Sequence, residues 1–119
     1  MKTLVLGAST NPTRYSNIAT LRLLERGHDV VLVGNRDGEI QGHPIETSRV
    51  RPDDVDTVTL YLGPRRQEAY YDYLVDELRP RRIIFNPGTE NETLRTRAQA
   101  AGIETDYACT LVMLGAGTY

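Results

Sequence analysis

The chain has 119 residues, a formal net charge of −2, and 25% charged and 39% hydrophobic side chains. These values describe one ordinary globular domain that buries roughly two thirds of its unfolded surface. The slightly acidic charge balance excludes a general nucleic-acid-binding surface, which would carry a basic stripe. A single cysteine, Cys109, excludes an internal disulfide and fits a reducing cytoplasm, and no apolar run reaches the roughly 20 residues that a membrane span requires.

The first third of the chain predicts a strand, a helix and a second strand. The run KTLVLG, residues 2–7, is apolar and ends at a glycine, as a buried strand does. It starts almost at the first residue, so we expect a cytoplasmic protein without a signal peptide. Residues 17–27 have the spacing of a helix that ends at Gly27. Its apolar face is formed by Ile18, Leu21 and Leu24. The run DVVLVG, residues 29–34, predicts the second strand.

The rest of the chain repeats this alternation. Residues 56–63 are rich in β-branched side chains and predict a third strand, and residues 66–78 predict a helix before Pro80. The stripe of that helix consists of Tyr70, Tyr73, Leu74 and Leu78. Residues 81–86 predict a fourth strand.

A third helix, a fifth strand and a short last element complete the pattern. Thr89 and Glu92 have the spacing of a capping box for a helix that ends at Gly102. The fifth strand is predicted at residues 103–108 and the last element at residues 109–114.

Strands that alternate with helices predict a parallel sheet covered on both faces. We therefore expect an α/β fold, a Rossmann-like doubly wound parallel sheet of about five strands, in a single domain over residues 1–119. The strands should contain Leu4, Val5, Val31, Leu32, Val58, Leu60, Ile83, Ile84 and Ile103. Ligands of such folds bind outside the carboxyl ends of the strands, so the loops after the strands are the candidate site.

The loop LGASTNPTRYSN, residues 6–17, follows the first strand and has the residues of a phosphate site. Gly7 permits a tight turn and a close approach of the backbone to a ligand. Ser16 is placed to cap the following helix, whose N-terminus attracts anions, and Arg14 adds a planar guanidinium suited to phosphate oxygens. A capped turn with a solvated arginine is the alternative interpretation.

The end of the second strand distinguishes between nucleotides. NAD sites place an acid there to hold the ribose hydroxyls, whereas this chain has Gly34, Asn35 and Arg36. An arginine suits an additional phosphate on the adenosine ribose, which both NADP and coenzyme A carry. A surface arginine in a turn is equally compatible with the sequence.

The remaining reactive side chains indicate no catalytic and no metal site. His28 follows a helix-ending glycine, and His43 lies in a loop flanked by glycine and proline where we expect it to be exposed. Cys109 has no histidine beside it and is interpreted as a small buried apolar residue, or alternatively as a thiol near a bound ligand. Arg65 and Arg66 are interpreted as solvated, and Asn86 as a strand-end residue with a possible ligand contact.

Taken together, GASTNPTRYSNIATLRLLERGHDVVLVGN, GEIQGHPI, NPGTEN and CTLVML occur in the order found in small bacterial CoA-binding proteins, which this chain resembles over nearly its whole length. Those proteins are similar to the CoA-binding domain of the succinyl-CoA synthetase α-subunit. The resemblance implies that coenzyme A binds through its nucleotide end. It assigns the phosphate loop to Gly7, Ala8, Ser9, Asn11, Arg14 and Tyr15, and the adenosine side to Asn35 and Arg36. Many relatives have a proline, often followed by a lysine, where this chain has Gly34-Asn35-Arg36.

With this resemblance and without catalytic groups, we expect a non-enzymatic domain that binds coenzyme A or acyl-CoA as a carrier, a sensor or a partner subunit. The histidine-bearing second domain of the synthetase would not fit into 119 residues. A homo-oligomer or an acyl-CoA enzyme partner is compatible with this function. The alternatives are an NADP-binding domain with a redox role and a protein-interaction module with a degenerate nucleotide pocket.

Overall fold

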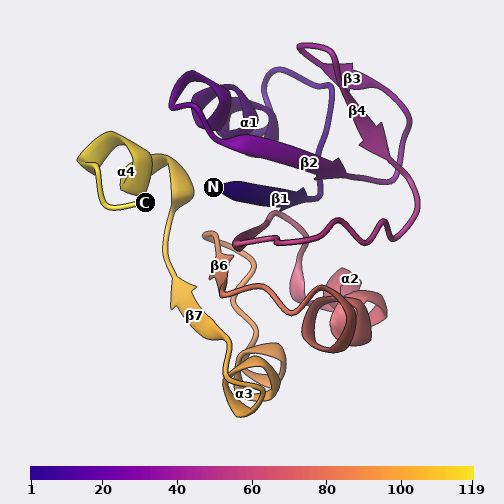
Figure 1. Ribbon diagram of the computed structural model, residues 1–119, viewed down its shortest axis with the longest axis vertical. Coiled ribbons are helices and arrows are strands. Elements are labelled where there is room, and N and C mark those ends of the chain that lie inside the picture. The colour runs from indigo at the N-terminus through magenta and orange to yellow at the C-terminus, as the bar shows by residue number, and fades with distance from the viewer.

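A computed structural model describes all residues, 1–119, as one seven-stranded sheet with helices on both faces (Figure 1). The strands are β1 (Lys2–Leu6), β2 (Asp29–Val33), β3 (Glu39–Ile40), β4 (His43–Glu46), β5 (Thr57–Leu60), β6 (Arg82–Phe85) and β7 (Glu104–Tyr107). Their order is β3-β4-β2-β1-β5-β6-β7, and every neighbouring pair is parallel except β3 and β4. The predicted Rossmann-like α/β class is therefore confirmed.

The sheet has two strands more than the sequence predicted. Residues 39–46 form a small hairpin in which β3 and β4 are antiparallel, and β4 continues the parallel sheet beside β2. Gln41 and Gly42 turn this hairpin with φ of 48° and 82°. A Gln-Gly turn flanked by so few residues, with Pro44 in the edge strand, gives little strand signal. The prediction of an exposed loop at His43 is wrong, because this residue belongs to β4 and is half-buried.

The predicted helices are all present, and one of them is irregular. The regular helices are α1 (Tyr15–Glu25), α2 (Pro64–Gln67), α3 (Glu92–Ala100) and α4 (Thr110–Ala116). The segment predicted as one helix over 66–78 is instead α2, a 3₁₀ turn η1 (Glu68–Tyr70) and a π-helical turn η2 (Tyr73–Leu78). Ile103 precedes β7 by one residue and is buried there rather than within the strand.

Both predicted N-terminal helix caps are wrong. Ser16 lies within the first turn of α1, and Arg14 occupies the N-cap position without a side-chain bond to the backbone. Asn91 caps α3, because its Oδ1 accepts a hydrogen bond of 3.1 Å from the N–H of Leu94. Thr89 instead donates its hydroxyl to the carbonyl of Asn86 at 2.7 Å.

The apolar side chains form one cluster on each face of the sheet. α1 and α4 cover one face, and η2 and α3 cover the other (Figure 1). The buried face of α1 differs from the predicted stripe of Ile18, Leu21 and Leu24. Its buried residues are Ser16, Asn17, Ala19, Thr20 and Leu23.

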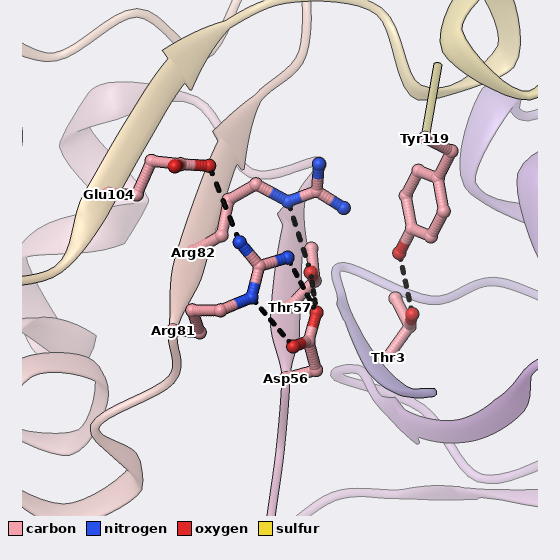
Figure 2. Close-up of polar contacts among 7 residues, drawn as sticks. All are labelled: Thr3, Asp56, Thr57, Arg81, Arg82, Glu104 and Tyr119. Carbon is pink, nitrogen blue, oxygen red and sulfur yellow. Dashed lines mark hydrogen bonds and ion pairs between the residues drawn. The ribbon is translucent and has the colours of Figure 1, made fainter. Parts of the chain in front are cut away.

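A polar cluster joins the last residue to the amino ends of the central strands (Figure 2). The hydroxyls of Tyr119 and Thr3 share a hydrogen bond of 2.5 Å. The buried guanidinium of Arg82 lies 4.7 Å from the centre of the Tyr119 ring. Beside it, Arg81 donates two hydrogen bonds to the carboxylate of Asp56, at 2.8 and 3.1 Å. These contacts hold the chain after α4 against β1 and β6.

The Asp56–Arg81 pair predicts a pH-dependent contribution to stability. Hydrogen bonds from Arg81 hold the pKa of Asp56 below its usual value. A depressed pKa stabilises the fold at pH values above the unfolded-state pKa of about 3.9, and this stabilisation is lost as the pH falls through the lower folded-state pKa. We expect the free energies of unfolding of the wild-type and Asp56→Asn proteins, measured in urea, to converge as the pH falls below about 4. A difference that stays constant down to about pH 2 would contradict the assignment.

Candidate functional site

A cleft of about 500 Å³ lies at the carboxyl ends of the strands. Its walls are the loops that follow β1, β2, β5 and β6. β1 and β5 are neighbours in the sheet, and the chain leaves them toward opposite faces, to α1 and α2. This is the switch point at which doubly wound sheets bind ligands, so the cleft is the candidate functional site.

The cleft brings together every residue that the sequence predicted for ligand binding. They are Gly7, Ala8, Ser9, Asn11, Arg14, Tyr15, Asn35 and Arg36. The loop after β1 supplies five of them, α1 begins with Tyr15, and the loop after β2 supplies the other two. Their contact with a ligand remains a prediction.

The loop after β1 is held in shape by its own side chains. Asn11 Oδ1 accepts hydrogen bonds from the backbone and the hydroxyl of Thr13, at 3.0 and 2.7 Å. Ser9 Oγ accepts from the Asn11 N–H at 3.1 Å, and Asn17 donates to the Ser9 carbonyl at 2.9 Å. Ser9 and Asn11 therefore shape the loop, whatever contact they also make with a ligand.

The N-terminus of α1 faces the cleft with free donors. No hydrogen bond within the protein uses the backbone N–H groups of Tyr15 and Ser16, and the side chain of the N-cap residue Arg14 supplies no acceptor. The first turn of α1 contains no acidic residue. Unpaired N–H groups and the positive end of the helix dipole favour an anion at this position.

Two glycines allow the loop after β1 to lie against its neighbours. Gly7 has a φ of +99°, and a Cβ there would lie 3.1 Å from the carbonyl carbon of Tyr61. A Cβ on Gly34 would lie 2.5 Å from the carbonyl oxygen of Ala8 and 3.0 Å from Cγ2 of Ile45. The two cleft-lining segments after β1 and β2 thus touch through backbone atoms.

Substitution of Gly34 should damage this contact. We expect Gly34→Ala to lower the free energy of unfolding by about 1–3 kcal/mol, the range of overpacked sites, because the backbone around Ala8 must move. Gly115→Ala is the matched control, since nothing lies within 4 Å of its Cβ position in α4, and it should be neutral or stabilising by up to about 1 kcal/mol. Urea unfolding of the two variants measures the difference. Equal stabilities would contradict the tight contact.

Positive charge dominates the cleft. Arg14, Arg36 and Arg66 line it, and none of them forms a salt bridge, whereas Asp37 is the one acidic residue among the lining side chains. Arg66 is exposed, as the sequence predicts, but it also lines the cleft, which the sequence analysis does not anticipate. Its place in the helix that directly follows β5 was the available signal, because that helix starts at the ligand-binding edge. Arg65, its neighbour, is exposed and does not line the cleft.

The other reactive residues lie outside the cleft. His28, His43 and Cys109 are absent from its walls. Asn86 is also absent from the walls and is a buried structural residue, because its amide donates to Thr59 Oγ1 at 2.7 Å and to the Leu60 carbonyl at 2.8 Å. No group of three or more His, Cys, Asp or Glu side chains is arranged to hold a metal ion. None of the helices has the length and apolar character needed to cross a membrane.

Burial distinguishes the tyrosines of the cleft. Tyr61 is half-buried, and burial raises the pKa of its phenol to about 12. Its hydroxyl lies in the interior, so only part of the ring contributes to the cleft wall. Tyr15 is 72% exposed beside the N-terminus of α1 and is therefore free to contact a ligand.

Comparison with known proteins identifies the family. The family model described as the CoA binding domain matches residues 1–115. A crystal structure of an uncharacterized protein is 47% identical, with a TM-score of 0.96, over 99% of this chain and 97% of that chain. A conserved hypothetical protein from Pyrococcus furiosus is 32% identical over 93% and 97% of the two chains, with a TM-score of 0.82.

A dinucleotide-forming acetyl-coenzyme A synthetase from Ca. Korarchaeum cryptofilum shares the fold alone. It is 19% identical, with a TM-score of 0.73, and the match covers 87% of this chain but 25% of the synthetase. None of the curated proteins matches significantly. With its seven-stranded sheet, its cleft at the switch point and a family match over nearly its whole length, the chain belongs to the CoA binding domain family.

Proposed function

We propose that the cleft binds coenzyme A through its nucleotide end. The observation that carries this proposal is the concentration of unpaired positive charge on one cleft. Three arginines without acidic partners and the uncapped N-terminus of α1 converge there. Coenzyme A has a pyrophosphate and a ribose 3′-phosphate, and such groups prefer guanidinium forks and free backbone N–H groups. Membership of the CoA binding domain family supports the same ligand.

The arrangement of the cleft suggests which residues hold which group. The loop after β1, with Arg14 and the first turn of α1, suits the pyrophosphate, because it offers both a fork and free N–H donors. Asn35 and Arg36, at the end of β2, suit the ribose 3′-phosphate. Arg66, in helix α2 after β5, adds a third charge.

The domain acts by binding in this proposal and catalyses no reaction. The cleft has serines among its lining residues but no histidine, the most frequent general base, to activate them. A binding domain of this kind serves as a carrier, a sensor or a partner subunit of an acyl-CoA enzyme in the cytoplasm. Self-association is a further property to be measured.

A thermal-shift experiment tests the proposed ligand. A ligand that binds only the folded state stabilises it by about 2.7 kcal/mol at 100 times its Kd, which raises the Tm by several degrees, at roughly 2–8 °C per kcal/mol for domains near this size. We expect this rise with CoA and with acetyl-CoA. A rise of the Tm with NADP but not with CoA would instead indicate that the protein is an NADP-binding domain. No rise with CoA, NADP or ATP would indicate a degenerate pocket.

A further inference from the structure

A buried glutamine connects two walls of the cleft. Gln67 ends α2, directly after Arg66, and its side chain is completely buried. Its Nε2 donates hydrogen bonds of 2.8 Å to the carbonyls of Leu62 and Thr89. Leu62 follows β5 and Thr89 follows β6, and both line the cleft. The amide therefore ties together the loops of two neighbouring strands.

A second side chain orients this amide. Asn91 Nδ2 donates to Gln67 Oε1 at 3.0 Å and to the Tyr71 hydroxyl at 2.8 Å, while Asn91 Oδ1 caps α3. Both Nε2 donors and the Oε1 acceptor of Gln67 are thus used, so the side chain has one orientation. A satisfied buried network of this kind rigidifies its surroundings.

We infer that Gln67 is a positioning residue for ligand binding: it fixes the loops after β5 and β6 and thereby presents Arg66 to the cleft. This inference rests on the proposed binding of CoA. Arg66 is exposed and has no salt bridge or side-chain hydrogen bond of its own, so within the protein it is the backbone of α2 that sets the region its guanidinium can reach. The adjacent Gln67 anchors that backbone to the two carbonyls.

A double-mutant cycle between Gln67 and Arg66 tests the inference. Gln67→Met keeps the length and the apolar body of the side chain but removes both donors. We expect Gln67→Met and Arg66→Ala each to weaken CoA binding by about tenfold, and the double variant to bind about as weakly as Arg66→Ala alone. Calorimetric titration with CoA gives the affinities, and the Tm of each free protein is recorded in parallel.

The readouts separate positioning from a purely structural role. A structural role lowers the Tm of Gln67→Met and leaves its CoA affinity unchanged, which would overturn the inference. The inference would also be overturned if Gln67→Met reduced the CoA affinity by the same factor in the wild-type and Arg66→Ala backgrounds. An Arg66→Ala protein with unchanged CoA affinity would overturn it as well. Ile83→Val is the stability control: this core change lowers the Tm, and its CoA affinity should stay at the wild-type value.

Asn91→Ser provides a second route if Gln67→Met does not fold. Serine keeps the helix cap but removes the bond to Gln67 Oε1. We expect a loss of CoA affinity of a few-fold, and that loss should vanish in the Arg66→Ala background. A loss that persists there would contradict the inference. Failure of the wild-type protein to bind CoA would refute the proposed function, an outcome distinct from all of these.

Discussion

Replacement of Arg14 by alanine is expected to weaken CoA binding by at least tenfold and to leave the fold intact. Arg14 is exposed, it precedes α1 at the cleft, and it forms no salt bridge that supports the core. A hydrogen bond to a charged group contributes about 1.5–3 kcal/mol, which corresponds to a change in affinity of about tenfold or more. Calorimetric titration measures the affinity, and circular dichroism confirms the fold.

Two further variants isolate the guanidinium fork. Arg14→Lys should restore only part of the affinity, because lysine keeps the charge and loses the planar pair of donors. Arg65→Ala is the matched control, since it removes an exposed arginine that lies outside the cleft, and its effect should be small. Unchanged binding in a folded Arg14→Ala protein would show that the loop after β1 is only a turn before a helix.

Removal of the 3′-phosphate from the ligand is expected to have an effect of similar size. If Arg36 contacts that phosphate, dephospho-CoA should bind the wild-type protein about tenfold or more weakly than CoA does. The Arg36→Ala variant should bind the two ligands with nearly equal affinity, because the contact that distinguishes them is gone. The same titration applied to both proteins and both ligands gives the comparison.

The opposite pattern would reassign this end of the cleft. Equal affinity of the wild-type protein for CoA and dephospho-CoA would show that Arg36 does not contact the 3′-phosphate. A preference for CoA that persists in Arg36→Ala assigns the phosphate to another cationic group, with Arg66 as the candidate on the neighbouring wall.

The strongly patterned parts of the chain were predictable from the sequence. The apolar runs of β1, β2, β5 and β6 are central strands buried on both faces, which is why they read as continuous apolar segments. The rule that ligands bind at the carboxyl ends then placed the loop after β1 at the cleft. The close contact of Gly34 with Ala8 was not predicted, although the missing side chain of Gly34 is what that contact requires.

The features that sequence patterns missed depend on contacts between distant residues. The β3–β4 hairpin is too short to carry a periodic signal. The cap of α3 is Asn91 rather than Thr89, because the Thr89 hydroxyl donates its hydrogen bond to the Asn86 carbonyl. Gln67 has no local pattern at all, since its partners lie up to 24 residues away. Its role becomes visible only when the loops after β5 and β6 meet.

Calorimetric titration of the wild-type protein with CoA at fixed salt tests the central claim most directly. The charged cleft predicts saturable binding at one site per chain, with an affinity for CoA higher than for dephospho-CoA or NADP, and weaker binding at higher salt because exposed charges are screened. An absence of saturable heat with CoA, or an affinity for NADP that exceeds the affinity for CoA, would contradict the account.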